Sequence, residues 1–572
     1  MSGASASANE PRIWLNVTTS TNWTRPAVGI VRVEMELCKE LSKLYGDRFS
    51  QCVVKNGAFV PHVPDIGENE TETALFWPEA SRRFPKSSTF EFISGDKKIT
   101  AVSVEPTADL ETRKVTTFDS KPKISFGDII ISVGLDWDHG TADLFADLNR
   151  KMGIRFVTCC YDLIPILFPQ FCVGEVSAYF KQYFTKLSWS SSLILCISKQ
   201  SEQDYRKLAE NMGFPYVPTA VIPLGDNVAP AVVDDEAERE IAINVVRAMD
   251  EPFILFVGTI ERRKNHEVLY RAYHLLAREG KLADVPKLVF VGMAGWGVGD
   301  LLKDIELDPL VKNKIMLLNH VSDTELALLY ENAKFFVYPS FYEGWGLPVG
   351  EALAFGKVVI ASDQGSIPEV GGNLVIYADA WNPREWAEQI YRLATSRDIL
   401  EAYASNIAKN YHKREWSETA VVVRNAITSL IEQAPPKPIT FYPGYDMHTS
   451  IGLPCGGTVL STGEAGALTY GPYVGLEKGA YDIEIFFDKL FGSAGNCQAV
   501  VASDIGQTVH ASLGHRFEMN ETMSGSILMR RVLFETAVTD YEVAVYIDKG
   551  LMISISRIEV RPALQQSTSK LS

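Results

Sequence analysis

The chain has 572 residues, which is too long for a single hydrophobic core, so two to four domains are expected. Its 46% hydrophobic and 22% charged residues are ordinary for a globular protein. The formal net charge of -16 argues against general nucleic-acid binding, which needs a basic face, although a local basic patch is not excluded.

Two further features bear on the cellular compartment. No apolar run is long enough to cross a bilayer, and the first ten residues lack the charged and apolar regions of a signal peptide. The eight cysteines show no paired spacing, so we interpret them as buried thiols in a reducing compartment and predict no metal site. Together these features predict a cytoplasmic protein.

The first half of the chain alternates strand-like and helix-like segments after a polar tail, residues 1–11. A glycine-containing loop separates the first predicted strand from a helix with 3.6-residue periodicity over 30–41. The predicted strands are 12–18, 127–138, 156–162, 193–198 and 220–225. This alternation predicts a doubly wound α/β domain. Residues 50–125 contain short strand-like runs, such as 90–94 and 98–104, and indicate no function.

The loop before the first helix is a candidate ligand contact. Gly29 lets the backbone approach a ligand closely, or it serves only a tight turn. Arg25 and Arg32 are placed to meet an anionic acceptor, or they are solvated surface arginines.

Polar residues follow two of the buried strands and form a predicted site rim. Asp136, Asp138 and His139 follow the strand at 127–138, and Tyr161 and Asp162 follow the next strand. Ligands in open α/β sheets gather beyond the carboxyl ends of strands. For Asp162 an alternative remains open, because it can instead cap the next helix.

An acidic segment, 234–240, leads into a second run of alternating strands and helices. The strand over 253–257 is followed by a basic turn that contains Arg263 and Lys264 at a helix start. Two cations beside free helical N–H groups form a diphosphate trap, unless the turn is only solvated. Further predicted segments are strands beginning at 287, 315, 335 and 357 and a final helix over 416–431.

The most informative stretch is 337–354, which reads as a buried strand, a glycine-rich turn and a helix that begins near 347–349. Glu343 lies in the turn and Glu351 one turn into the helix. Gly344 and Gly346 permit close approach of a ligand to the backbone. A carboxylate can accept two hydroxyl hydrogen bonds, which suits the vicinal diol of a ribose or hexose. A helical glutamate stabilised by the helix dipole is the simpler alternative.

In this context, the pair Glu343 and Glu351 resembles the signature of retaining GT-B glycosyltransferases, especially family 4, which includes many bacterial mannosyl- and rhamnosyltransferases. The resemblance covers about residues 12–432. It implies two Rossmann-like domains facing each other across a cleft. Residues 12–228 would form the acceptor side, and residues 229–432 would bind the nucleotide sugar.

The resemblance also implies roles for individual residues. Glu343 would face the donor sugar, Glu351 would bind the ribose, and Arg263 with Lys264 would bind the donor phosphates. The run Tyr161-Asp-Leu-Ile-Pro resembles the family's His-Asp-Leu-x-Pro motif, with Tyr161 in place of the histidine. The expected catalytic residues are Glu343, Asp162 and Lys264. The expected donor-binding residues are Gly29, Thr259, Arg263, Lys264, Val321, Glu343, Gly346, Leu347 and Glu351.

The implied activity is retaining, metal-independent transfer of a hexose or deoxyhexose, with mannose or rhamnose favoured. The donor would be a nucleotide-diphosphate sugar such as GDP-mannose, with no further cofactor and no nucleic acid. The acceptor would be a bacterial surface polysaccharide such as O-antigen, carried on a lipid, with peripheral contact at the inner face of the plasma membrane. Polysaccharide-assembly proteins or a second copy of the chain are candidate partners. The alternatives are a GT-B nucleotide-sugar epimerase and a non-catalytic glycan-binding or scaffold protein.

After a proline-rich linker, 433–440, the pattern changes to short alternating strands with glycine turns. The strands expected at 479–487, 498–502, 541–547 and 551–560 predict an all-β sandwich over 441–565, followed by a tail, 566–572. It is a candidate carbohydrate-binding domain. Tyr470, Tyr473 and Phe487 would stack on sugar, unless they are core or interface aromatics.

Overall fold

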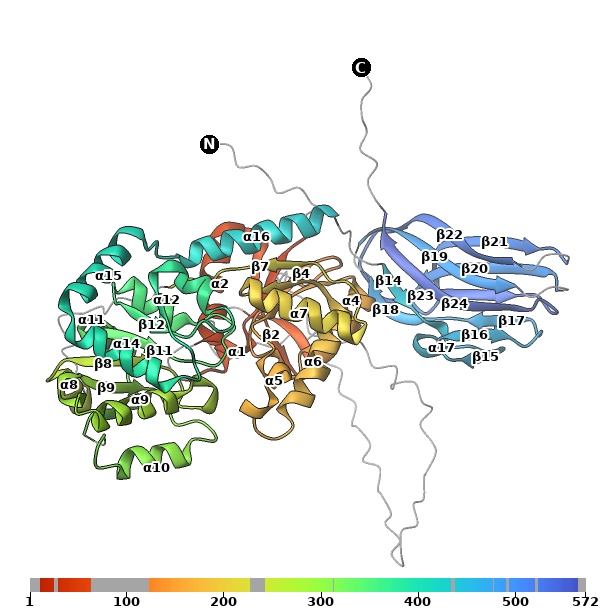
Figure 1. Ribbon diagram of the computed structural model, residues 1–572. Helices are drawn as coiled ribbons and strands as arrows, with labels where there is room; N and C mark the ends of the chain where they lie inside the picture. Colours follow the sequence, from red (N-terminus) through yellow and green to blue (C-terminus); the bar gives the residue numbers. More distant parts are fainter. Residues whose placement is uncertain are drawn as a thin grey trace, which may run out of the picture. The chain divides into compact units, whose positions relative to one another are not determined.

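The computed structural model describes residues 11–24, 29–62, 123–226, 242–311, 313–433, 438–476, 478–489, 493–519 and 523–563 (Figure 1). The chain divides into two compact units, residues 1–57 with 125–439 and residues 58–124 with 440–572. Several predictions lie outside the described residues: most of both tails, Arg25, the runs at 90–94 and 98–104, the acidic segment and the centre of the linker. Because 227–241 and 434–437 are also outside, the domain boundaries stay predictions.

The first unit contains a sheet with the strand order β2-β1-β4-β5-β6-β7 in the described residues, and β3, Ala58–His62, belongs to the second unit. The pairs from β2 to β7 are parallel. The strands of this unit's sheet are β1 Ile13–Asn16, β2 Phe49–Lys55, β4 Ile129–Ser132, β5 Arg155–Cys160, β6 Ser191–Cys196 and β7 Thr219–Val221. The helices are α1 Thr18–Thr21, α2 Ile30–Tyr45, α3 Asp136–His139, α4 Ala142–Met152, α5 Ile164–Leu167, α6 Val176–Ser190 and α7 Lys199–Met212. We call these elements the first half.

A second sheet in the same unit has the order β10-β9-β8-β11-β12-β13, and its pairs are parallel. The strands are β8 Phe253–Val257, β9 Lys287–Val291, β10 Ile315–Leu318, β11 Phe335–Tyr338, β12 Val359–Ala361 and β13 Ile376–Tyr377. The helices are α8 Ile243–Met249, α9 His266–Arg278, α10 Gly299–Leu307, α11 Asp323–Asn332, α12 Leu347–Ala354, α13 Ile367–Gly371, α14 Pro383–Thr395 and α15 Arg397–Asn410. We call these elements the second half.

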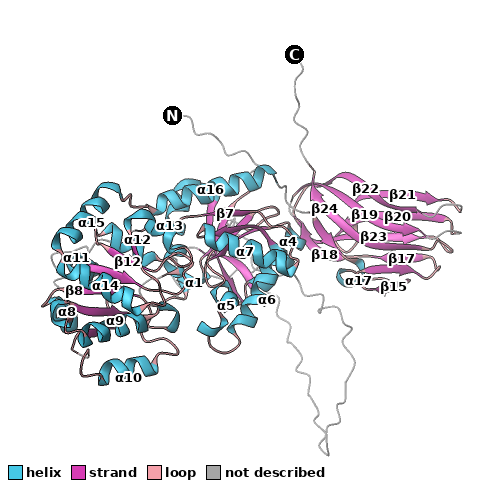
Figure 2. Cartoon of the chain, viewed as in Figure 1, coloured by secondary structure: helices cyan, strands magenta, loops and turns pink. Residues whose placement is uncertain are grey.

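Burial explains why these segments form parallel strands. All four residues of β4 and all four of β11 are buried, as expected for strands covered by helices on both faces (Figure 2). The last helix of the unit, α16 (Trp416–Gln433), packs against α2 and β6. The predicted fold class, α/β with two Rossmann-like parallel sheets, is confirmed.

The described residues of the second unit from Thr440 onward lie mostly in antiparallel strands (Figure 2). Its sheets have the orders β15-β16-β24-β19-β22, with β14 on β24, and β17-β23-β20-β21, with β18 on β23. The strands are β14 Ile439–Phe441, β15 Gly452–Cys455, β16 Thr458–Ser461, β17 Gly466–Thr469, β18 Pro472–Leu476, β19 Gly479–Lys489, β20 Gly495–Ser503, β21 Thr508–Phe517, β22 Met523–Phe534, β23 Val538–Ile547 and β24 Ile553–Pro562. The short helix α17, Pro443–Asp446, precedes β15.

Alternating burial along β19 gives this unit its core, which agrees with the predicted β-sandwich. Tyr481, Ile483, Ile485 and Phe487 point inward and are at most 6% exposed. Phe487 is therefore a core aromatic, which confirms the core alternative and excludes its stacking on sugar. Its position on the inward face of the strand is the reason.

The cysteines follow the prediction of buried thiols only in part. Cys159, Cys160 and Cys196 lie buried in adjacent strands of the first half, and the structure pairs none of the eight in a disulfide. Cys455 is exposed, because it ends β15 at the edge of its sheet. In the described residues, no helix is both long and apolar enough to cross a bilayer, and no group of three side chains is arranged to hold a metal ion.

A buried carboxyl group in α2 predicts a pH-dependent stability. Glu34 is fully buried, and burial raises its pKa to about 7, although the amide of Ser20 donates to it at 2.6 Å. Because the folded pKa exceeds the unfolded one, the neutral form is favoured in the fold, and this stability is lost as pH rises through 7. Glu34→Gln should therefore stabilise the protein at pH 8 by about 3 kcal/mol, at about 1.4 kcal/mol for each pKa unit, and much less at pH 5.

Urea unfolding of the wild type and the variant at both pH values measures this effect. Glu36→Gln, on the same helix but with a side chain that is 32% exposed, is the matched control. Equal stabilisation by Glu34→Gln at pH 5 and pH 8 would contradict the pKa assignment.

Candidate active site

The turn between β11 and α12 lies at the carboxyl end of a central strand. β11 pairs with β8 on one side and β12 on the other, so the turn lies next to the loop that follows β8. Gly346 precedes α12 with a φ of 95°, a left-handed conformation that favours glycine. The predicted strand, turn and helix are confirmed, with Gly346 and Leu347 at the helix start.

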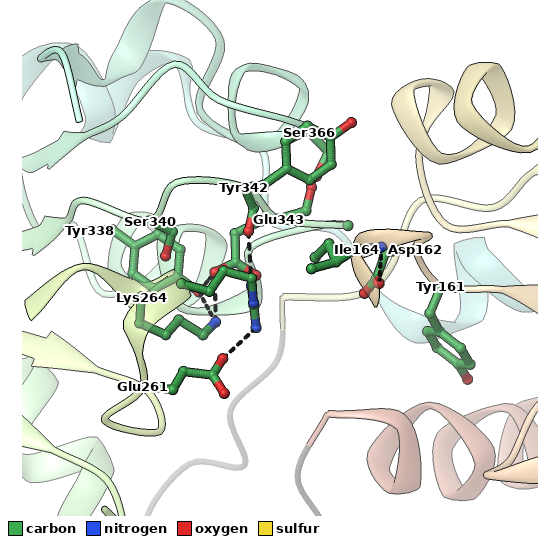
Figure 3. A network of polar contacts seen from close by, with 12 residues as sticks. Tyr161, Asp162, Ile164, Glu261, Lys264, Tyr338, Ser340, Tyr342, Glu343 and Ser366 are labelled. Atoms are coloured by element: carbon green, nitrogen blue, oxygen red, sulfur yellow. Dashed lines mark hydrogen bonds and ion pairs between the residues drawn. The ribbon is translucent and has the colours of Figure 1, made fainter. Parts of the chain in front are cut away.

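Two of the three cationic side chains in the loop after β8, those of Arg263 and Lys264, contact the carboxylate of Glu343 (Figure 3). The Lys264 Nζ atom lies 2.6 Å from Glu343 Oε1, and Arg263 Nη1 lies 2.7 Å from Glu343 Oε2. Arg263 also contacts Glu261 at 2.8 Å. The hydroxyl of Tyr338 accepts from Lys264 at 2.8 Å and donates to Glu343 at 3.0 Å. We call these five residues, Glu261, Arg263, Lys264, Tyr338 and Glu343, the Glu343 cluster.

Electrostatics keep this cluster charged although it is buried. Burial alone would raise the pKa of Glu343, but the charges of Arg263 and Lys264 outweigh it and lower that pKa to about 2. Burial opposes the charge of Arg263, yet Glu343 and Glu261 raise its pKa. Burial lowers the pKa of Lys264, and Glu343 offsets only part of this effect. The cluster therefore presents two cations and a permanently ionised carboxylate.

Backbone contacts hold the turn to the β8 loop. The amide of Phe341 donates to the carbonyl oxygen of Arg263 at 2.9 Å, and the Arg263 guanidinium donates to that of Tyr342 at 2.8 Å. On the other side of the turn, Ser366 donates to the Glu343 carbonyl from its amide at 3.1 Å and its hydroxyl at 2.9 Å. These bonds fix the direction in which the Glu343 side chain points.

The first half contributes Asp162 to the same place (Figure 3). A methyl group at Gly344 would lie 2.4 Å from the carbonyl oxygen of Tyr161 and 2.9 Å from Cβ of Asp162, so only glycine permits this contact. Asp162 accepts the amide of Ile164 at 3.0 Å, but Leu163 is the N-terminal cap of α5 and that helix has no side-chain capping bond, so the capping alternative is not confirmed. Burial raises its pKa, and Arg263 opposes the shift.

Glu351 lies outside the Glu343 cluster and joins the two halves. It is 5% exposed, and it accepts from Arg32 Nη1 at 2.8 Å and from the Tyr330 hydroxyl at 2.8 Å. Burial raises its pKa, and Arg32 opposes the shift. The expectation that Arg32 is a solvated surface residue is wrong, because its side chain is 13% exposed and paired with Glu351.

The remaining residues that were predicted to bind the donor lie in separate loops outside the Glu343 cluster. Thr259 packs beside Gly295 in the loops that follow β8 and β9. Val321 is half-buried just before α11, and Gly29 precedes α2 with open space around its backbone. Among the described residues, neither Val321 nor Gly29 forms a hydrogen bond with the Glu343 cluster.

The predicted rim is wrong for two residues, Asp136 and Tyr161. Tyr161 is 8% exposed, and its hydroxyl donates to the carbonyl oxygen of Val133. Asp136 is 2% exposed and accepts from Ser132 at 2.6 Å and Thr141 at 2.8 Å, so it serves the core of the first half. Those two hydroxyls donate hydrogen bonds to the buried carboxylate of Asp136, so this carboxylate does not face the predicted ligand site.

Sequence reasoning missed Glu261 and Tyr338 as partners of the cluster and Tyr330 as a partner of Glu351. Tyr338 ends the buried strand β11 and Glu261 follows β8, so both lie at the same sheet edge, and this position could have indicated them. Tyr330 has no such signal, because it lies on α11 among other apolar residues.

Comparison with known proteins places this site in a family context. Residues 238–411 match the family model described as glycosyl transferases group 1, and this range contains the whole Glu343 cluster and Glu351. The chain is 31% identical over 225 residues to the O-antigen chain mannosyltransferase B of Escherichia coli, covering 39% of this chain and 57% of that protein. It is 29% identical over 293 residues to the serotype-specific mannosyltransferase WbdA of Escherichia coli, covering 49% of this chain and 34% of that protein.

The chain therefore spans only about a third to three fifths of the length of these two curated relatives. Among solved structures, a sucrose-phosphate synthase from Thermosynechococcus elongatus aligns with a TM-score of 0.48 at 18% identity, covering 74% of this chain and 100% of that one.

Proposed function

We propose that the chain is a glycosyltransferase that uses a nucleotide-diphosphate sugar, and the support is the match of residues 238–411 to the family model described as glycosyl transferases group 1. The observation that carries the proposal is the contact of Arg263 and Lys264 with Glu343 inside that domain. Two cations suit a diphosphate, and the ionised carboxylate suits the hydroxyl groups of a sugar.

The proposed reaction is transfer of a hexose or deoxyhexose, mannose or rhamnose, to a bacterial surface polysaccharide such as O-antigen. The support comes from the similarity to proteins named as O-antigen and serotype-specific mannosyltransferases. The proposed acceptor is carried on a lipid, so the protein would work in the cytoplasm, in peripheral contact with the inner face of the plasma membrane. Polysaccharide-assembly proteins or a second copy of the chain are the proposed macromolecular partners.

The geometry of the Glu343 cluster supports a separate role for each residue in the proposed sugar transfer. Arg263 and Lys264 would neutralise the diphosphate as the bond between its oxygen and the anomeric carbon breaks. The acceptor oxygen would bond to the same face of that carbon, and its proton would pass to the departing phosphate oxygen. This same-face route retains the anomeric configuration. The positive charges that stabilise the leaving diphosphate would be those of Arg263 and Lys264. Glu343 would orient the donor sugar and Asp162 would face it from the first half.

The carboxylate of Glu351 would receive the ribose hydroxyls. Arg32 and Tyr330 each engage one of its oxygens, and a carboxylate has about four acceptor positions, so two remain for the diol. Arg32 and Tyr330 would then fix the orientation of this carboxylate.

A thermal-shift series with GDP, UDP, dTDP, their sugar conjugates and inorganic pyrophosphate tests the nucleotide site, because a ligand of the folded form raises the midpoint. One nucleoside diphosphate should raise the midpoint most. Glu351→Gln should weaken its binding about tenfold, and leave pyrophosphate binding unchanged, because only the ribose contact is lost.

Tyr330→Phe, which removes one partner of Glu351 and keeps the charge, is the matched control and should have a smaller effect. Equal loss of nucleotide and pyrophosphate binding in Glu351→Gln would contradict the ribose assignment. If no nucleotide shifts the midpoint, the non-catalytic glycan-binding alternative replaces the proposal. A sugar donor consumed at the same rate without acceptor would favour the epimerase instead.

A further inference from the structure

The first turn of α7 in the first half is capped by a side chain of the second half. The carboxylate of Glu369, on α13, accepts the amide of Lys199 at 2.8 Å through one oxygen and that of Gln200 at 2.8 Å through the other. Helix N-termini leave such amides without partners inside the helix, and a carboxylate there is favoured by the helix dipole. Two hydrogen bonds between residues 169 and 170 positions apart therefore connect the halves.

The first two turns of α7 contact both chain neighbours of Glu343. The hydroxyl of Tyr342 donates to Asp204 Oδ2 at 2.5 Å, and Asp204 is held in turn by Gln200 at 2.9 Å. The Ser201 hydroxyl lies 2.8 Å from the carbonyl oxygen of Tyr161 and 3.4 Å from that of Gly344. Displacement of α7 would therefore shift the backbone on both sides of Glu343.

Glu369 is also connected to Glu343 within the second half. Helix α13 begins directly after Ser366, which donates twice to the Glu343 carbonyl oxygen. Figure 3 shows Ser366 and Tyr342 beside Glu343, with Asp162 approaching from the first half. The cap on α7 and the support of Glu343 thus belong to one continuous segment, residues 366–369.

We propose that Glu369 and the first two turns of α7 form a clamp that positions Glu343 against the first half during sugar transfer. The clamp consists of Glu369, Lys199, Gln200, Ser201 and Asp204. Glu369 is a positioning residue, because it acts on Glu343 through Ser366 and α7 and contacts none of the side chains assigned to the donor. The inference rests on the proposed function for its effect on catalysis, but the contact itself can be tested without any substrate.

Glu369→Gln is the decisive variant, because an amide can accept only one of the two N–H bonds. With GDP-mannose as donor and a mannose-terminated lipid-linked oligosaccharide as acceptor, kcat should fall about tenfold or more, as expected for loss of a charge-assisted bond. The affinity for GDP should change less than twofold. Tyr342→Phe, which breaks the bond to Asp204, should lower kcat in the same way, and the double variant should lose less than the product of the two effects.

Glu325→Gln is the matched control. Glu325 also accepts two backbone amides, those of Ser322 and Ala242, but both belong to the second half. It should cost a similar amount of thermal stability and leave kcat unchanged. Normal kcat in a folded Glu369→Gln protein, or an equal fall in Glu325→Gln, would overturn the proposal.

Hydrogen exchange separates this inference from the proposed function. In Glu369→Gln without substrate, the amides of the first turn of α7 should exchange faster, while those of its last turn keep their protection. Unchanged exchange in the first turn would refute the clamp even if the protein transfers sugar. Faster exchange in a protein that transfers no sugar from any donor would refute the proposed function and leave the clamp as a structural contact.

Discussion

Replacing Glu343 with glutamine is expected to lower kcat about 10²- to 10³-fold, while the affinity for nucleoside diphosphate stays the same or rises up to about tenfold. The loss of activity follows because an ionised carboxylate, kept charged by a pKa of about 2, would no longer face the donor sugar. The gain in affinity follows because Glu343 contacts both Arg263 and Lys264, and a diphosphate has to compete with it for those cations.

Calorimetric titration with GDP and initial rates with GDP-mannose measure the two effects on the same preparation. Glu388→Gln, an exposed glutamate on α14, is the control for general loss of negative charge. A large loss of GDP affinity in Glu343→Gln would contradict the assignment, because it would mean that Glu343 supports nucleotide binding rather than the sugar.

The second large effect is expected at Lys264. Lys264→Met should weaken the binding of GDP and of inorganic pyrophosphate alike, about 10- to 100-fold, because a charge-assisted bond to phosphate is lost. In the wild type, burial lowers the pKa of Lys264, so its charge and the affinity for pyrophosphate should decrease as pH rises through that lowered pKa.

Lys264→Arg provides the control, because a guanidinium stays charged at all accessible pH values. Its affinity for pyrophosphate should be nearly independent of pH between 7 and 10, once the ionisation of pyrophosphate is subtracted. A decrease of the same size in Lys264→Arg and the wild type would place the titrating group elsewhere.

The core of the site could be predicted because its parts follow neighbouring parallel strands. Arg263 and Lys264 follow β8 and Glu343 follows β11, and the carboxyl ends of paired parallel strands share one sheet edge. The glycines around Glu343 identified the turn, and Gly346 does take the left-handed conformation expected there. The local sequence pattern and the geometry of the parallel sheet were therefore sufficient to predict that Arg263, Lys264 and Glu343 lie together.

The contacts between the halves could not be predicted in this way. Arg32 and Glu351 are 319 residues apart, and nothing in the local sequence of either indicates the other. The bond between Glu369 and α7 likewise depends on the packing of two separately formed sheets. In the second unit, β21 escaped prediction because nearly all its residues are at least partly exposed, so it lacks the alternation of a half-buried strand.

The measurement that tests the central claim most directly is release of nucleoside diphosphate from GDP-mannose with and without a mannose-terminated lipid-linked oligosaccharide. The account predicts release that depends on the acceptor, a product extended by one sugar with the anomeric configuration of the donor, and loss of both in Glu343→Gln. Acceptor-independent turnover, or an extended product formed equally well by Glu343→Gln, would contradict it.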